Sequence, residues 1–343
     1  MKNLLLPLSL LISIFSYSQS TTSAVEYMDY FTAEYTKIQK DSWDYTKSVS
    51  HGRSARKVEK KRVELIQSSS AALNKAKGAK EFEGNASYRD SVVEYFELLG
   101  KVLREDYAEI VDMEEIAEQS YDLMEAYMMA RDQAGEKMKA ASKMISREQR
   151  TFAEGHNITI IEDDSDLSKK MEIADMVYDH YNEVYLIFFK SYKQELYLLE
   201  AIERKDVSAI EQNRNALLET AEEGLLKLQS IELFEDDNSM IEATEALLAF
   251  YKDEAENGVD IILNFIEQNE SFAKMKMAFD KKKPKDRTKE DVEEFNNGVN
   301  AVNSSVKEYN ELNEVSNRDR SEAIDKWNTT AERFTSKHVP KGK

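Results

Sequence analysis

The chain has 343 residues, of which 66 are Asp or Glu and 47 are Lys or Arg, so its formal net charge is −19 at pH 7. Its 3 prolines and 10 glycines are too few for the many turns of an all-β sandwich or barrel. The lack of cysteine excludes a disulfide framework, a thiolate zinc site, a cysteine nucleophile and a lipid-modified N-terminal cysteine.

The first 18 residues are typical of a secretory signal peptide. Lys2 supplies the positive start, Leu4–Phe15 is a mostly apolar run, and small residues precede a predicted cut after Ser18, with a cut after Ser20 as the second choice. A membrane anchor is the alternative, but the run is shorter than the ~20 residues that span a bilayer. We therefore expect export to the periplasm, the cell surface or the medium, with no transmembrane anchor after cleavage.

Removal of residues 1–18 takes away Lys2 and changes the net charge from −19 to −20. A chain of this charge repels nucleic acid over most of its surface. We therefore expect no nucleic-acid partner.

Helical periodicity runs through nearly the whole mature chain. One stripe repeats at spacings of three and four residues and consists of Met28, Phe31, Tyr35, Ile38, Ser42, Tyr45 and Val49. Similar stripes predict helices over residues 63–73, 92–111 and 120–152. Residues 156–166 then break the pattern with a β-branched run followed by acids, so the N-terminal bundle is predicted over residues 19–158 and an acidic linker over 159–166.

The second half, residues 167–343, is predicted as a C-terminal helical bundle. Apolar stripes mark helices over residues 173–188, 210–228, 247–266 and 292–334, and the last of these carries a phase skip near Leu312. Pro284 lies in a Lys-rich loop insertion near residues 280–289. The predicted fold class is therefore all-α, with long amphipathic helices.

The two halves are predicted to be related, because the first falls on the second at a shift of 152 residues. Leu65 then aligns with Leu217, and the S-x-x-acid capping signal at Ser87 aligns with the one at Ser239. The ends align at a shift of 182, with His156 on His338, which leaves thirty extra residues around Pro284. We expect two tandem related bundles of three to four helices each; the alternative is one continuous helical array without a repeat.

Motifs for catalysis and metal binding are missing from the sequence. None of the four histidines follows a Glu by three residues, as a di-iron bundle requires. The acidic turn from Asp164 has Lys169 where a calcium loop needs glycine. No nucleophile-elbow, zinc-protease, dinucleotide or phosphate-loop motif occurs. We therefore predict a protein that is not an enzyme, with no catalytic residue, no metal ligand and no cofactor.

Histidines and aromatic residues leave two questions open. His180 beside Asp179 could ligate a metal but is expected to be helix surface, and His156 and His338 are expected to end their helices. Tyrosines recur on the first helix of each half, and they predict either core packing or an aromatic cleft between the halves.

Two basic islands interrupt the acidic chain. They consist of Arg53, Arg56, Lys57, Lys60 and Lys61 (continued by Arg62), and of Lys281, Lys282 and Lys283 (continued by Lys285 and Arg287). Such islands can bind an acidic partner, or they can be solvated cations only.

The helix ends RTFAEGHNI and ERFTSKHVP, with the signal peptide and the acidic helical body, resemble a family of exported all-helical bacterial surface proteins of the leptospiral type. The resemblance implies a surface protein over most of the mature chain. Lipoprotein members of that family carry a cysteine that this chain lacks, so lipid anchoring is not implied.

The predicted function is that of an exported, non-catalytic helical protein that binds a partner protein or an envelope polymer, with the basic islands as the candidate contact residues. The alternative is a small-molecule or metal-binding protein that uses an aromatic cleft between the helical halves.

Overall fold

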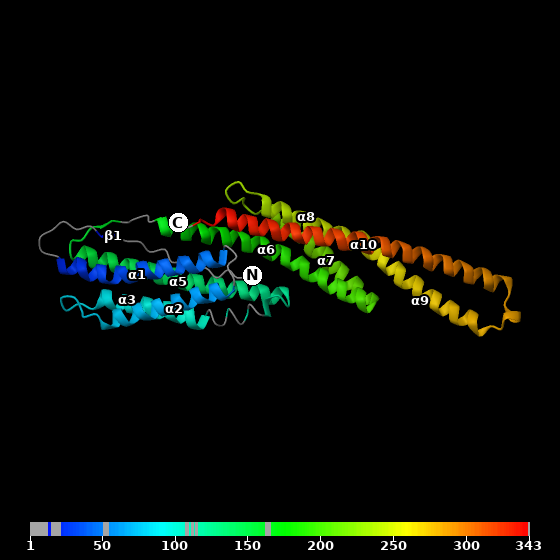
Figure 1. The fold of residues 1–343 in the computed structure, drawn as a ribbon, viewed down its shortest axis with the longest axis horizontal. Helices are drawn as coiled ribbons and strands as arrows, with labels where there is room; N and C mark the ends of the chain where they lie inside the picture. The colour runs from blue at the N-terminus through cyan, green and yellow to red at the C-terminus, as the bar shows by residue number, and fades with distance from the viewer. Residues whose placement is uncertain are drawn as a thin grey trace. The chain divides into compact units, whose positions relative to one another are not determined.

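The computed structural model describes residues 13–14, 22–50, 55–106, 110, 113, 116–161 and 166–341, and it confirms an all-α protein (Figure 1). The first half contains β1 (Ser13–Ile14), α1 (Thr22–Ser50), α2 (Ala55–Gly78), α3 (Ser87–Lys101), the π-turn η1 (Val102–Asp106), α5 (Tyr121–Gly155) and β2 (Ile160–Ile161). The second half contains α6 (Asp166–Arg204), α7 (Val207–Leu228), α8 (Ser239–Asp253), the π-turn η2 (Glu254–Gly258), α9 (Val259–Lys281), the short 3₁₀ turn η3 (Pro284–Asp286) and α10 (Lys289–His338).

Several predicted features lie outside the described residues. These are most of the signal peptide (1–18), Arg53 and the centre of the acidic linker (162–165). Ser13–Ile14 is described, and it pairs antiparallel with Ile160–Ile161. No helix in the described part of the chain combines the length and apolar character needed to cross a membrane.

The chain divides into two compact units, Met1–Asn182 with Arg333–Lys343, and Glu183–Glu332. Helices α6 and α10 each contribute residues to both units. The boundary predicted at 159–166 divides the chain into its two sequence halves, not into these two units, and it stays a prediction.

The first unit is held together by an aromatic core. Helix α1 packs on α2, α2 on α3, and α3 on α5. Phe31 and Phe96 are buried, and the ring of Tyr35 lies 5.0 Å from that of Phe96 and 5.2 Å from that of Tyr95. Because burying each such ring removes about 150–250 Å² from water, these contacts stabilise the packing of α1 against α3.

The second unit has an aliphatic core around one tryptophan. Trp327 of α10 stacks on Phe188 of α6 at 4.2 Å, and Leu247 and Leu248 of α8 are fully buried. Gly224 of α7 faces Leu248 so closely that an added Cβ would lie 2.7 Å from that side chain. The lack of a side chain at this position therefore lets α7 approach α8.

The elements of the first half recur in the second half at the predicted shift of 152 residues. Helix α3 and π-turn η1 recur, residue for residue, as α8 and η2. The turn before each helix also recurs, with one isolated bridge between Phe82 and Asn85 and another between Phe234 and Asp237. A left-handed residue follows each phenylalanine, Glu83 at φ 51° and Glu235 at φ 48°. This agreement in register supports the predicted repeat.

The capping prediction at these turns is wrong in one detail. Ser87 and Ser239 begin their helices, but neither side chain caps the helix. The caps come from two residues earlier, because Asn85 Oδ1 accepts the Ser87 N–H at 2.8 Å and Asp237 Oδ1 accepts the Ser239 N–H at 3.0 Å. An Asx side chain bonds a backbone N–H two residues on, so it reaches the first helical amide, whereas a serine inside the helix does not.

Candidate functional site: the basic tip of a helical arm

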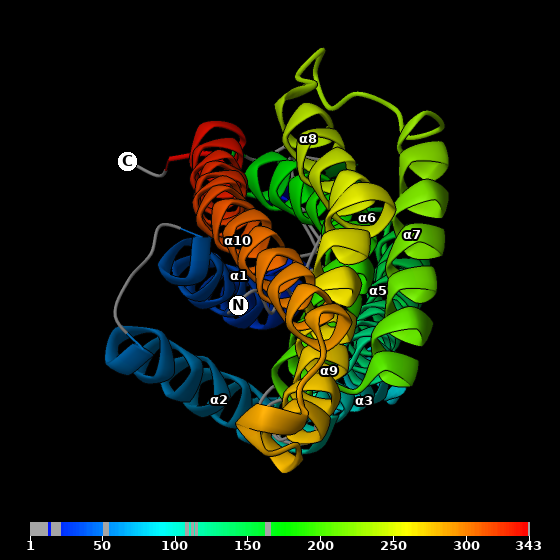
Figure 2. The same cartoon turned by 90° about the vertical axis from the view of Figure 1, so that its right-hand side faces the viewer.

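The thirty extra residues of the second half extend a helical hairpin, which we call the arm (residues 259–302). It consists of α9 and the beginning of α10, which run side by side to the turn at Pro284 in two views (Figures 1 and 2). In the first half the corresponding stretch, between η1 and α5, spans only residues 107–120. The second half is therefore thirty residues longer than the first half at this place.

Aromatic stacking holds the two helices of the arm together. Phe279 of α9 stacks on Phe295 of α10 at 4.4 Å, and at the base of the arm Phe265 stacks on Tyr309, which follows the arm on α10, at 4.2 Å. Between them Gly298 of α10 meets α9, where an added Cβ would lie 2.7 Å from the sulfur of Met275. These contacts run from the base of the arm to its end, so the arm is a packed element.

The turn at the end of the arm is also fixed by its own side chains. We call residues 281–289 the basic tip. Lys282 pairs with Asp291, and the guanidinium of Arg287 lies 4.1 Å from the centre of the Phe279 ring. Thr288 and Asp291 cap α10 reciprocally, because each side chain accepts the backbone N–H of the other residue, at 2.9 Å and 3.2 Å.

The remaining cations of the basic tip point to solvent. Lys281 and Lys283 were predicted as contact residues, and Lys285 and Lys289 extend the set; all four are exposed. Among the described residues, no ion pair joins any of these four lysines to an acid. A shallow hollow beside them on α10 is lined by Arg287, Thr288, Lys289, Val292, Glu293, Asn296 and Asn297. The tip thus offers several unpaired charges on a fixed turn.

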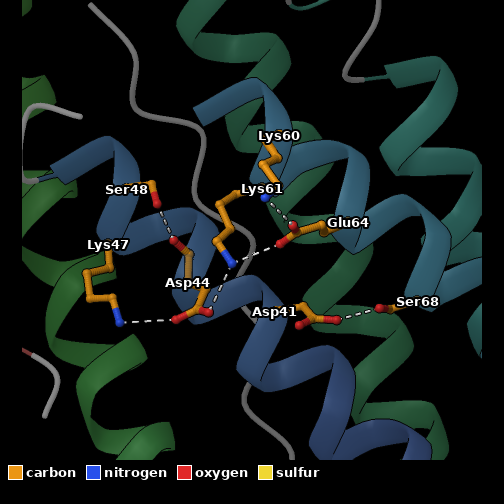
Figure 3. A network of polar contacts seen from close by, with 8 residues as sticks. All are labelled: Asp41, Asp44, Lys47, Ser48, Lys60, Lys61, Glu64 and Ser68. Carbon is orange, nitrogen blue, oxygen red and sulfur yellow. Dashed lines mark hydrogen bonds and ion pairs between the residues drawn. The ribbon is translucent and has the colours of Figure 1, made fainter. Parts of the chain in front are cut away.

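Part of the first basic island is neutralised by acids within its own unit. Figure 3 shows Lys61 of α2 between two carboxylates, at 3.3 Å from Asp44 of α1 and 2.8 Å from Glu64. These contacts lower the pKa of Glu64, chiefly through the hydrogen bond from Lys61. Lys60 also pairs with Glu64, at 3.7 Å. This network joins α1 to α2, so it belongs to the packing of the bundle.

Of the other predicted residues of that island, Arg56 and Lys57 are exposed at the start of α2, and Arg53 lies outside the described residues. Arg62 forms an ion pair with Glu59 at 2.9 Å, and this raises the pKa of the Arg62 guanidinium. The structure therefore separates the two islands: in the first, Lys60, Lys61 and Arg62 are paired with acids, whereas in the second most of the lysines are exposed and unpaired.

A third basic surface was not predicted from the sequence. A hollow along one face of α5 is lined by Lys139, Ser142, Lys143, Ser146, Arg147, Arg150, Thr151 and Glu154. Lys139 is paired with Glu136 and Arg147 with Glu148, each at 3.1 Å. The signal in the sequence was a row of cations four residues apart, at Lys139, Lys143 and Arg147.

The histidines end their helices as expected. His156 caps α5, and its ring lies 4.5 Å from that of Phe152; His338 is the last residue of α10, and its ring lies 4.7 Å from that of Phe334. The imidazole of His180 packs on Phe334 at 5.3 Å. Across the described ranges, no group of three or more His, Asp or Glu side chains is arranged to hold a metal ion.

The tyrosine stripes lie partly in the cores of the units. Tyr35, Tyr45, Tyr178 and Tyr185 are buried, and Tyr30 is 44% exposed. Burial raises the pKa of Tyr35 well above its ordinary value. The core interpretation of these stripes therefore accounts for these four buried tyrosines, whereas Tyr27, Tyr181, Tyr192 and Tyr197 are half-buried.

Fold and site together define an all-α protein built from recurring helical elements, with one projecting arm. Comparing the chain with models of protein families, with curated proteins and with solved structures yields no match in any of the three.

Proposed function

We propose that this protein is an exported, non-catalytic helical protein that binds an anionic partner, either a partner protein or a polymer of the cell envelope, through the basic tip. Export is supported by the charge and length pattern of residues 1–18 and by the resemblance of the helix ends to exported surface proteins.

The observation that carries the proposal is the display of Lys281, Lys283, Lys285 and Lys289 on a turn that is fixed from within. A site on a rigid support loses less conformational freedom on binding than the same lysines on a mobile loop would lose. Against a net charge of −19, the tip is also a local positive region that attracts acids, although the protein as a whole is negatively charged. An acidic protein surface or an anionic polymer fits both properties.

The test is affinity capture from the envelope fraction of the organism that makes the protein, with the mature full-length chain as bait. Reversal of the tip charges in K281E/K283E/K285E should abolish capture of the specific partner. The matched control is R56E/K57E, which reverses exposed cations at the start of α2 and should leave capture unchanged.

The captured material identifies the class of partner. A species removed by protease is a protein, and one that survives protease but is removed by polymer-degrading enzymes is an envelope polymer. Capture should weaken as salt is raised, because the contact is electrostatic. Equal capture by the parent chain and by K281E/K283E/K285E would refute the proposal.

A further inference from the structure

A cluster of buried charges lies in the second unit, where three helical elements meet. Arg320 of α10 forms ion pairs with both Glu195 of α6 and Glu254, the first residue of η2. The side chains are 13% (Arg320), 1% (Glu195) and 6% (Glu254) exposed. One arginine thus joins two carboxylates that are almost completely removed from water.

If both acids are ionised, the cluster carries one negative charge that Arg320 does not compensate. Its formal charge would be −1, and burial of an uncompensated charge is very unfavourable. In addition, the second oxygen of each acid, Oε2 of Glu195 and Oε2 of Glu254, is buried with no hydrogen-bond donor in the described part of the chain. A proton between the two carboxyl groups would remove the excess charge and supply the missing donor.

The surrounding groups do not supply a second positive charge. The neutral side chains beside the cluster include Tyr251 on α8, with Tyr192 of α6 near it, and Asn317 on α10, whose Oδ1 accepts a hydrogen bond from Arg320 at 2.7 Å. On the other elements around η2, the nearby charges are paired with one another: Arg214 of α7 with Asp260 of α9, and Glu222 of α7 with Lys252 of α8. Arg320 is therefore the single cation of the cluster within the described residues.

The fold does not require this cluster, because the first half is built without it. At the shift of 152, Val102 occupies the place of Glu254 and Leu99 that of Tyr251; at the shift of 182, Met138 occupies the place of Arg320. All three are buried with no exposed surface. The same π-turn, with the same bounds in register, thus forms around apolar side chains in one half and around charges in the other.

We propose that Glu195 and Glu254 hold one proton between them in the folded protein, and that a rise in pH towards neutrality removes the stabilisation that this proton gives to the junction of α6, η2 and α10. The proton would lie on Glu254 and be donated to Glu195, while Glu195 remains the acceptor of the Arg320 guanidinium. The inference does not rest on the proposed partner, because the cluster is internal to the unit.

The electrostatics agree with this arrangement. Burial, reinforced by the negative charge of Glu195, raises the pKa of Glu254 to about 7. Burial also raises the pKa of Glu195, although Arg320 opposes the change. Since the folded pKa lies above the ordinary value, the proton stabilises the fold fully at acid pH, and this contribution is lost as the pH rises from the ordinary value of 4.5 through about 7.

The test follows unfolding of the full-length chain by urea at a series of pH values from about 5 to about 8. Trp43 belongs to the first unit and Trp327 to the second, so a W43F background makes the fluorescence report on Trp327. The unfolding equilibrium constant should rise with pH up to about pH 7, by up to about tenfold per pH unit for one proton, and should level off above that value. Substitution E254Q should remove most of this rise, because an amide does not titrate in this range.

Two further variants keep the test decisive. Asp175 of α6 also has its pKa raised to about 7 by burial, but it lies in the first unit, so D175N should leave the slope reported by Trp327 unchanged. If E254Q fails to fold, E195L/E254V/R320M, which has no titrating group in the cluster, should give a slope near zero. Infrared difference spectra should show a protonated carboxyl band at low pH that E254Q or E195L/E254V/R320M lacks. An unchanged slope in E254Q or in E195L/E254V/R320M, or a parent chain with no slope, would overturn the inference.

Discussion

The indole Nε1 of Trp327 donates a hydrogen bond to the hydroxyl of Thr244 at 2.9 Å, inside the core of the second unit. Thr244 is fully buried and in turn donates to the Met240 carbonyl at 2.8 Å. Because the ring of Trp327 also stacks on Phe188, one side chain ties α10 to both α6 and α8.

Replacement of this tryptophan should destabilise the protein in two measurable steps. W327F removes the hydrogen bond and part of the ring, so we expect a loss of about 1–3 kcal/mol in the free energy of unfolding. W327A also leaves a large cavity and should cost about 3–5 kcal/mol. V315A, on the same helix but 45% exposed, is the control and should change stability little. Equal losses for W327F and W327A in urea unfolding would contradict this account.

Removal of Arg320 should be more harmful than removal of the whole charged cluster. R320M leaves two buried carboxylates without a cation, so we expect a loss of about 3–5 kcal/mol. E195L/E254V/R320M replaces all the charges with apolar groups, and such replacements are neutral or stabilising by about 1–4 kcal/mol. Thermal unfolding of the two variants and the parent chain measures the difference in stability. A triple variant that is less stable than R320M would contradict the prediction.

The arm should depend on the lack of a side chain at Gly298. G298V places a branched side chain where a Cβ already meets the sulfur of Met275 at 2.7 Å, so α9 and α10 should separate locally. We expect faster hydrogen exchange at residues 272–279 and faster cleavage of the arm by protease. G78V, at a helix end where an added Cβ meets nothing within 4 Å, is the matched control. Unchanged exchange in G298V would mean that Met275 moves aside without opening the arm.

The basic tip should loosen in acid. The hydrogen bond from Lys282 lowers the pKa of Asp291, and the backbone N–H of Thr288 adds to this. Since the folded pKa is depressed, the stabilisation is present above the ordinary value of 3.8 and is lost as the pH falls through the lowered folded value. Exchange of the Thr288 amide, corrected for the intrinsic effect of pH, should therefore rise below that point, and D291N should show the fast rate already at neutral pH.

Loss of the Thr288 cap should weaken the first turn of α10. T288A removes the hydroxyl that accepts the Asp291 N–H at 3.2 Å, and loss of such a cap costs about 1 kcal/mol. The effect should be confined to amides near the tip in hydrogen-exchange measurements. S304A, which removes an exposed serine contact further along the same helix, should leave those amides unchanged. A global loss of stability in T288A would contradict a local role.

The helices and their recurrence could be predicted from sequence because both depend on local, periodic information. The stripe from Met28 to Tyr45 describes one face of a helix, and a fixed shift of 152 residues carries Ser87 onto Ser239. The basic tip was found for the same reason, since Lys281–Lys283 is a contiguous run beside a proline.

The buried cluster could not be predicted, because nothing local distinguishes its members from solvated charges. Glu195 and Arg320 are 125 residues apart, and each stands among other charged residues on a long helix. Only the tertiary packing turns both of them inward. The π-turns could not be predicted for a related reason. An extra residue in a helical turn has no signature in composition, and η1 and η2 differ at every one of their five positions.

An antiparallel pair of helices can lengthen at its turn without altering the body from which it grows. About seven residues make two full turns of a helix. If each helix gains about seven residues, the same side still faces the partner helix, and only the loop lies farther out. The thirty residues gained around Pro284 are close to two such additions to both helices. Evolution of this protein could therefore tune the reach of its lysines in discrete increments, while the surrounding bundle keeps its register.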